Sequence, residues 1–444
     1  MKTLRIGAGA GYSGDRIDPA VELAAKGAIQ YLVFECLAER TIALAQEAKR
    51  QDPEAGYDPL LEERMEAVLG LCAKNGICVI SNMGAANPLA AAKKTREVAQ
   101  RMGLRGLRIA AVTGDDVLPL LESNHFTLNE NGICTESMAE RLISANAYLG
   151  IDSIVEALTD GADVILTGRV ADPSLFLAPV VHEFGWSRDD WDLLGQGTVN
   201  GHLLECAGQV TGGYFADPGY KDVPDLARLG FPIAEISQDG SAILTKVEGS
   251  GGLVSVATCS EQLLYEIQDP SAYLTPDVVA DFSHVSIEQA ALNRVQIRGG
   301  KGHRRPETLK VSVGYRDGYV GEAQISYAGP GALARAQLAR EILCERVKGM
   351  AFHEFRCDFI GIDSILGKQL SKKRPEPMEV RLRVAGRAST RKAASMIPRE
   401  VEALYTNGPA GGGGVAGSTR GTIAILSTLI PREMVAHNIT YEVS

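Results

Sequence analysis

Several signatures of common protein classes are missing from this chain of 444 residues, and each absence narrows its range of functions. The eight cysteines include no C-x-x-C pair, which argues against zinc ribbons and thioredoxin-type chemistry. The chain also lacks G-x-S-x-G, Walker and H-E-x-x-H motifs and the kinase signature set. The commonest hydrolases, NTPases, metalloproteases and kinases are therefore not indicated, and we predict no metal site.

Positive charge and long hydrophobic runs are also scarce. The 45 Lys and Arg are outnumbered by 55 Asp and Glu, and the net charge of −10 disfavours nucleic-acid binding, which needs a basic face. No run approaches about 18 uninterrupted apolar residues, so we expect no membrane span. Residues 1–6 run straight into a strand without a signal-peptide core. Scattered cysteines are typical of reduced proteins, so we expect a cytoplasmic location.

The first half of the chain alternates apolar runs with helical segments. Five short runs are typical of parallel strands buried on both faces: Leu4–Ala8, Tyr31–Cys36, Ile77–Ser81, Arg108–Val112 and Asp163–Thr167. Helices are predicted to start at Asp18-Pro19, Asp58-Pro59 and Asn87-Pro88, where a capping residue precedes a proline, and Gly76 can end the second. The pattern predicts an α/β fold with a doubly wound, mostly parallel sheet, and we assign this Rossmann-like domain to residues 1–230.

The pattern changes from about Phe231. Apolar and polar residues alternate, as in strands, over 242–247, 253–258 and 380–384. Alternation over 309–315, the turn residues Arg316-Asp317-Gly318 and a return through 325–327 predict a hairpin. Helices are expected at Ala332–Val347 and Pro398–Tyr405. Residues 231–444 are therefore predicted to form an α+β domain with antiparallel hairpins, packed on the first domain.

Polar side chains follow the predicted parallel strands at their carboxyl ends. Glu35 lies at the end of the second run, next to its last residue, Asn82 and Asp115 follow the third and fourth, and Arg169 and Asp172 follow the fifth. Ligands bind outside the carboxyl ends of strands in an open parallel sheet, so these residues predict one ligand site. Arg169 can clamp a carboxylate with two hydrogen bonds. Asp172 is either a catalytic group or only a helix cap.

A glycine-rich loop follows the first run. Residues 9–14 match G-x-G-x-x-G, and Glu35 lies where the ribose-binding acid of a dinucleotide site would be. In that fingerprint the helix starts within the loop, whereas here the predicted start at Asp18-Pro19 comes four residues later. A tight turn that needs glycine is the alternative. The residues of this loop that we expect to contact a ligand are Gly11, Tyr12 and Asp15.

A predicted helix over residues 195–209 supplies candidates for proton transfer. His202, Cys206 and Gln209 would share one face, with Glu205 beside them. His202 and Glu205 are the best general acid/base candidates, because histidine titrates near neutrality. A metal site would need further ligands that we cannot assign, and a buried cysteine is usually a small apolar residue. A buried polar network without catalytic function is the alternative.

Two segments of the second half are candidates for binding phosphate. Residues 298–306 form the most basic segment of this acidic chain and suit the phosphates of coenzyme A or a nucleotide, with a solvated surface loop as the alternative. The cations assigned to this role are Lys301, Arg304 and Arg305. Successive N–H groups in 407–415 suit an anion nest, an oxyanion hole or a mobile lid. The glycines assigned there are Gly411, Gly412 and Gly413.

Long blocks of the chain resemble the acyclic terpene utilization family (AtuA-like proteins), and together they run nearly from end to end. The blocks are Gly9–Arg16, Tyr31–Thr41, Val79–Ala92, Thr167–Pro179, His202–Pro218, Gln262–Ser283 and Asn407–Val415. The resemblance implies bacterial catabolism of acyclic terpenes and branched acids through acyl-CoA intermediates, and it transfers no catalytic residues. The small C-terminal domain of some members is not apparent, so we expect a separate small partner subunit.

These observations lead us to expect a cytoplasmic catabolic enzyme, assembled as a homo-oligomer. It would act on a small carboxylate or its acyl-CoA thioester by hydratase- or lyase-like acid/base chemistry, with coenzyme A entering only as part of the substrate. One alternative is a non-catalytic acyl-CoA-binding or scaffold subunit of a larger complex. A second is an NAD-dependent oxidoreductase.

Overall fold

The computed structural model describes residues 2–371 and 377–444, which form two compact units. Unit 1 consists of Met1–Gly314 with Ile425–Ser444, and unit 2 consists of Tyr315–Ala424. This division differs from the domains 1–230 and 231–444 expected from the sequence. The reason is that strands formed after residue 230 extend the first sheet, whereas unit 2 is a single continuous segment between two parts of unit 1.

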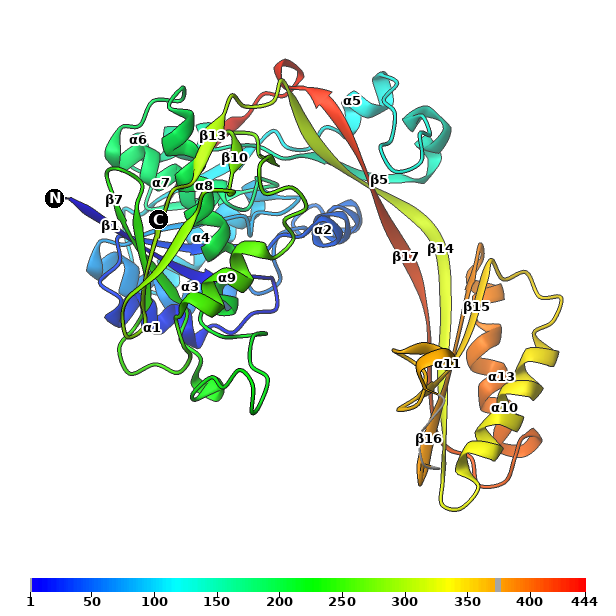
Figure 1. Ribbon diagram of the computed structural model, residues 1–444. Helices are drawn as coiled ribbons and strands as arrows, with labels where there is room; N and C mark the ends of the chain where they lie inside the picture. Colours follow the sequence, from blue (N-terminus) through cyan, green and yellow to red (C-terminus); the bar gives the residue numbers. More distant parts are fainter. Residues whose placement is uncertain (1, 372–376) are drawn as a thin grey trace. The chain divides into compact units, whose positions relative to one another are not determined.

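A ten-stranded sheet forms the centre of unit 1 (Figure 1). Five parallel neighbours make its middle, in the order β1 (Thr3–Ala10), β2 (Tyr31–Phe34), β3 (Cys78–Ser81), β6 (Val164–Thr167) and β4 (Arg108–Thr113). Antiparallel strands extend both edges: β7 (Pro232–Ser237), β8 (Ala242–Lys246), β12 (Arg294–Arg298) and β11 (Ser286–Ala291) beyond β1, and β18 (Asn438–Val443) beyond β4. The predicted α/β class is confirmed, and the sheet is parallel in its middle but mixed as a whole.

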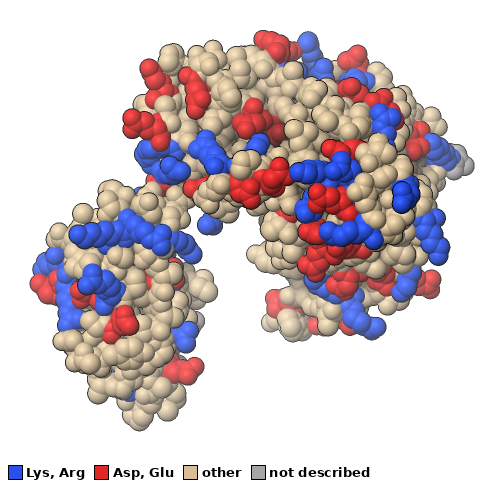
Figure 2. All heavy atoms as spheres, turned by 180° about the vertical axis from the view of Figure 1, so that it is seen from behind, with Lys and Arg blue, Asp and Glu red and all other residues tan. Residues whose placement is uncertain are grey.

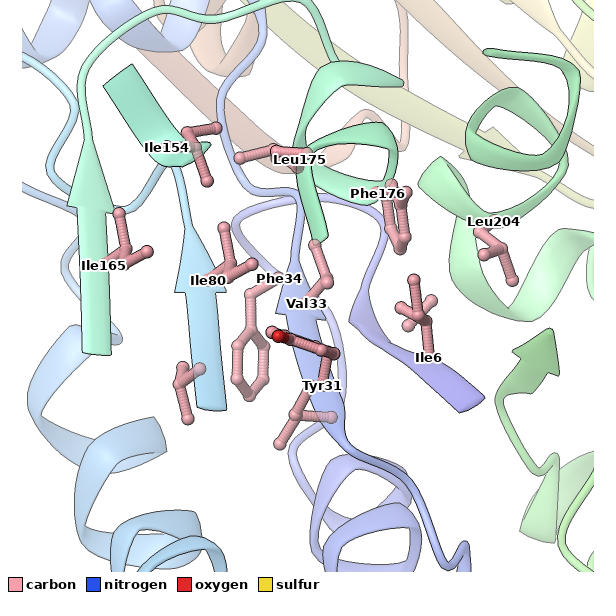
Figure 3. Close-up of a cluster of buried hydrophobic side chains, with 14 of the residues drawn as sticks. Ile6, Tyr31, Val33, Phe34, Ile80, Ile154, Ile165, Leu175, Phe176 and Leu204 are labelled. Atoms are coloured by element: carbon pink, nitrogen blue, oxygen red, sulfur yellow. The ribbon is translucent and has the colours of Figure 1, made fainter. Parts of the chain in front are cut away.

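Helices pack against the strands in two groups. One group comprises α1 (Asp18–Lys26), α3 (Leu61–Asn75) and α4 (Pro88–Arg101), and the other comprises α6 (Asp152–Thr159), α7 (Ser174–Phe184), α8 (Trp191–Glu205) and α9 (Val256–Leu264). Strand register places Val33, Ile80 and Ile165 side by side, and Figure 3 shows them below Ile154 and Leu175 of the second group. Burial of these side chains removes apolar surface from water, which drives the packing.

Short helices, strands and turns complete unit 1. They include α2 (Glu39–Gln51), α5 (Leu118–Ser123), β5 (Leu142–Ala147) and a small sheet of β9 (Tyr273–Leu274), β10 (Val279–Asp281) and β13 (Lys301–His303). The predicted helix boundaries hold at Asn87, whose side chain accepts the Ala90 N–H at 3.4 Å, and at Gly76, which is left-handed (φ 65°). Helix α3 starts at Leu61, slightly later than expected, because Asp58 caps the preceding turn through the Leu60 N–H.

Two local predictions are wrong. The strand predicted over 253–258 does not form, and residues 256–258 instead begin helix α9, because the Ser255 and Thr258 side chains cap its first turn reciprocally. The turn predicted at Arg316-Asp317-Gly318 is absent, because Thr308–Ala328 is one continuous strand, β14, that accommodates Gly318 at a positive φ of 84°. Strands β14 and β17 (Gly413–Pro431) therefore each run from one unit into the other.

Unit 2 is an α+β unit built on an antiparallel sheet. Its strands lie in the order β15 (Glu354–Ile360), β16 (Glu379–Ala388), β14 and β17. The helices are α10 (Ala332–Arg346), α11 (Gly367–Leu370), α12 (Arg391–Ala394) and α13 (Met396–Asn407). Ile325, Leu382 and Val384 of the sheet form its core with Leu343 and Val401 of the helices. Within the described parts of the chain, no helix combines the length and apolar character needed to cross a bilayer.

Candidate functional site

The carboxyl ends of the central strands approach the last turn of α8. Gly11, just beyond β1, lies so close to this turn that a Cβ atom built on it would be 2.5 Å from the carbonyl carbon of Cys206. Only glycine permits that approach without a backbone shift, so the glycine-rich loop and the end of α8 are in direct contact. Ionisable residues from β2, β6 and α8 interact electrostatically around this point.

Arg169, which follows β6, is the cation of this group. Its side chain is only 3% exposed, its Nη2 donates to Asp172 Oδ1 at 2.8 Å, and its guanidinium carbon lies 4.2 Å from the Tyr148 ring centroid. The buried Nε and Nη1 atoms have no partner among the described residues. Because buried polar groups are normally hydrogen-bonded, these two donors mark a position for a ligand acceptor.

Asp115 holds the backbone of Arg169 in place. Its Oδ2 accepts the backbone N–H of Arg169 and the Nδ2 of Asn146, both at 2.8 Å. A Cβ on Gly168 would overlap the Asp115 carboxyl group. Burial raises the pKa of Asp115 to about 6, although both hydrogen bonds oppose the shift. This carboxyl therefore holds the turn that presents Arg169.

Glu35 and Asn82, at the ends of β2 and β3, are joined as the sequence predicts for neighbouring strand ends. Asn82 Nδ2 donates to Glu35 Oε1 at 3.0 Å, and the Leu37 N–H donates to the same oxygen at 2.8 Å. Burial and the Asp172 charge raise the pKa of Glu35 to about 8, against the opposing effect of Arg169. This upward shift favours the protonated form of Glu35.

His202 and Glu205 form a buried pair in the last turn of α8. His202 Nδ1 and Glu205 Oε1 are 2.8 Å apart, and the imidazole lies 5.7 Å from the Tyr273 ring and 5.5 Å from that of Phe282. Within the described residues, His202 Nε2 and Glu205 Oε2 have no hydrogen-bond partner. Burial raises the pKa of Glu205 to about 7, and His202 opposes this shift. Burial alone would lower the pKa of His202, but the Glu205 carboxylate outweighs it and the net shift is upward.

Helix α8 ends at Glu205, four residues before the predicted end. Cys206 and Gln209 therefore leave the helical face that they were expected to share with His202. Burial raises the pKa of the Cys206 thiol above its usual value, which disfavours the nucleophilic thiolate.

Asp172 connects the two buried carboxyls. Its charge raises the pKa of both Glu35 and Glu205, and its side chain is 33% exposed, so solvent reaches the group there. The helix-cap alternative is not seen, because the residue at the N-terminal boundary of α7 is Pro173. We name Glu35, Arg169, Asp172, His202 and Glu205 the acid cluster.

Residues that the sequence did not single out complete the surroundings of Arg169. Tyr148 donates its hydroxyl to Glu39 Oε1 at 2.8 Å, and Lys310 Nζ donates to the same oxygen at 2.6 Å. Lys310 also lies over the Tyr148 ring. Its positive charge contrasts with the carboxyl groups of the acid cluster. No motif marks these residues, because they come from α2, the segment before α6, and β14.

The glycine-rich loop does not present free N–H groups in the manner of a dinucleotide site. The Gly11 N–H donates to Asp15 Oδ2 at 2.9 Å, and Asp15 also accepts the Arg16 N–H. Buried Arg64 donates through Nη2 to the Ser13 carbonyl at 2.9 Å. An internal carboxylate, that of Asp15, thus takes up the N–H group of Gly11 in the glycine-rich loop, while Tyr12 is 61% exposed.

The residues assigned to phosphate binding are divided between the two units. In unit 1, Lys301 pairs with Asp192 at 2.8 Å, Arg304 with Glu307 at 2.8 Å, and Arg305 lies 3.8 Å from Asp152. The three glycines of that prediction, Gly411, Gly412 and Gly413, belong to unit 2. Figure 2 shows similar interspersion of basic and acidic side chains over the larger unit on the face seen there.

A cavity of about 800 Å³ is lined in part by Asn82, whose Nδ2 donates to Glu35 of the acid cluster. Its walls come from α2, residues 52–59 and the start of α4. Separately, His125, Cys134 and Glu136 place metal-binding atom types within 4.8 Å of one another in the described part of the chain. None of these three belongs to the acid cluster, and His125 and Glu136 are exposed.

Comparisons with known proteins identify a family but no characterised relative. No curated protein matches the chain. A solved structure described as a homoserine dehydrogenase from Thiobacillus denitrificans shares 12% identity over 88% of this chain and 82% of that chain. Its TM-score of 0.15 is too low to support any argument about fold or function. The model of the acyclic terpene utilisation family protein AtuA matches residues 4–441. The chain therefore belongs to the AtuA family, whose membership implies a role in acyclic terpene utilisation.

Proposed function

We propose that the protein is an enzyme that adds water to a small unsaturated carboxylic acid or its acyl-CoA thioester, or removes water from the corresponding hydroxy compound. The observation that carries this proposal is the acid cluster, in which two buried carboxyls with raised pKa values accompany one arginine with two unpaired donors. Carboxyl groups with pKa values near the working pH are suited to proton transfer.

Each group has a distinct task in the proposed reaction. The Arg169 Nε and Nη1 donors bind the substrate carboxylate or thioester oxygen and stabilise the negative charge that develops on it. Glu205, held by His202, removes a proton from water as the oxygen bonds to the β-carbon. Protonated Glu35 donates its proton to the α-carbon. Asp172 orients Arg169 and links the two carboxyls to solvent, through which their protonation states are restored.

The proposal is tested by incubating the full-length protein with branched α,β-unsaturated acids and their CoA thioesters in H₂¹⁸O. Mass spectrometry would detect a hydrated product that carries ¹⁸O. Because general acid/base catalysis typically contributes about 10²- to 10⁴-fold, Glu205→Gln is expected to lower kcat by about 100-fold or more. Arg169→Lys removes the forked donor geometry and is expected to reduce kcat/KM by a similar factor.

A matched control distinguishes catalysis from stability. Glu66→Gln changes an exposed carboxyl of α3 that pairs with Arg101, so it should retain full activity. All variants are compared by thermal unfolding before assay. Full activity of both Glu205→Gln and Arg169→Lys would contradict the assignment. Absence of turnover on every acid and thioester, with retained binding of the thioesters, would favour a non-catalytic acyl-CoA-binding subunit instead.

A further inference from the structure

The cavity beside Asn82 is not used by the acid/base chemistry itself. Its volume of about 800 Å³ lies within the range typical of small-molecule pockets, about 300–1,000 Å³. Small apolar side chains contribute to its walls: Ala45, Ala48, Ala55, Ala85 and Ala90. Leu37 and Leu44 add larger apolar surface. A wall of this composition favours an uncharged, aliphatic occupant, because burial of apolar surface is the main gain available there.

The charged side chains on the wall of this cavity are mostly exposed, apart from buried Asp58, which is paired with Arg64 at 3.2 Å. Lys93 pairs with Glu54 at 2.9 Å and Lys94 with Glu97 at 3.0 Å, and all four side chains are at least a quarter exposed. Asp52 also lines the cavity and adds a third carboxylate. The rim therefore has no excess of positive charge with which to bind the phosphates of coenzyme A.

The buried end of the cavity leads to the acid cluster. Asn82 and Cys36 line this end and are 0% and 2% exposed. The Asn82 amide oxygen accepts the Cys36 N–H at 2.7 Å, and its Nδ2 donates to Glu35 at 3.0 Å. The Asn82 side chain thus lines the cavity and also contacts the carboxyl that is proposed to protonate the substrate.

We propose that this cavity binds the aliphatic chain of the substrate, with the unsaturated carbonyl end directed past Asn82 toward Glu35 and Arg169. The inference rests on the proposed function for the identity of the reacting end, but the binding of an aliphatic chain can be tested without turnover. It defines the substrate class as a carboxylic acid or thioester with an apolar tail of medium length, instead of a short polar acid.

The test is isothermal titration of the full-length protein with 1-octanol, which carries the aliphatic chain but no acid group. Ala48→Phe and Ala90→Phe each place a large ring in the cavity, from α2 and from α4 respectively. Each is expected to weaken octanol binding by about tenfold or more, because the ring fills space that the chain would occupy. Two variants on opposite elements keep the test valid if one of them fails to fold.

Ala25→Phe on the exposed side of α1 is the matched control and should bind octanol like the unmodified protein. Unchanged affinity in the folded cavity variants, or no saturable binding to the unmodified protein, would overturn the inference. Cavity-dependent binding without any hydration activity would refute the proposed function and leave this inference standing. Hydration activity together with octanol binding that neither cavity variant weakens would refute this inference and leave the proposed function standing.

Discussion

Replacement of Arg64 by methionine should strongly destabilise unit 1. Arg64 is completely buried on α3, and its Nη1 lies 3.2 Å from Asp58 Oδ1, which is also buried. Its Nη2 donates to the carbonyl oxygens of Ser13 at 2.9 Å and Asp15 at 3.2 Å. One side chain therefore neutralises a buried carboxylate and fixes the glycine-rich loop against the helix.

The expected cost follows from what the substitution leaves behind. Removing one partner of a buried ion pair typically costs about 3–5 kcal/mol, because the other charge stays buried without compensation. The two loop carbonyls also lose a donor, although water that enters the loop can replace it. Methionine retains most of the apolar contact of the arginine stem, so packing loss is small. We expect Arg64→Met to lower the free energy of unfolding by about 4 kcal/mol.

Urea unfolding followed by tryptophan fluorescence measures this effect, because Trp186 and Trp191, the two tryptophans of the chain, both lie in unit 1. Combining Arg64→Met with Asp58→Asn should recover part of the loss, since the uncompensated charge is removed. Arg101→Met, which breaks exposed ion pairs on the neighbouring helix, should cost at most about 1 kcal/mol. A loss below about 1 kcal/mol for Arg64→Met would refute the reasoning.

Three further predictions concern single residues. Because burial raises the pKa of Glu35 to about 8 from 4.5, its ionisation opposes folding, so the stability it contributes is complete below pH 4.5 and is lost up to about pH 8. The melting temperature of Glu35→Gln should rise relative to the unmodified protein between pH 5 and 8, and a constant difference would contradict this. Gly11→Ala should destabilise the protein by about 1–3 kcal/mol through its clash with Cys206, whereas Gly413→Ala, with open space around it, should cost less than about 0.5 kcal/mol in urea unfolding followed by circular dichroism, which reports both units. Exposed Cys344 should be alkylated by iodoacetamide faster than Cys206, which peptide mass spectrometry can resolve; equal rates would contradict this order.

Much of unit 1 could be predicted from sequence because its strands are buried on both faces. All four residues of β2 and of β6 are buried, so the segments appear as uninterrupted apolar runs. Polar residues at the ends of such strands meet at one sheet edge. The Glu35–Asn82 and Asp115–Arg169 hydrogen bonds are the direct result of this rule.

Other features depend on contacts between distant segments and leave no local pattern. Arg64 occupies one position of an amphipathic helix, and nothing in α3 indicates that it binds carbonyl groups about 50 residues earlier in the chain. Tyr148 and Lys310 meet Glu39 from segments more than 100 residues away in the chain, all within unit 1. The turn residues around Gly318 suggested a hairpin, but pairing of β14 with β16 over ten residue pairs favours a continuous strand.

The pH dependence of kcat/KM for hydration of a branched unsaturated thioester tests the central claim most directly. Glu205 must be ionised to act as the base, and Glu35 must be protonated to act as the acid. With pKa values of about 7 and about 8, these requirements predict a narrow bell-shaped profile with its maximum between them. In Glu205→Gln the limb on the acidic side should disappear from the residual activity. A profile that is flat from pH 6 to 9 would contradict the assignment of proton transfer to the acid cluster.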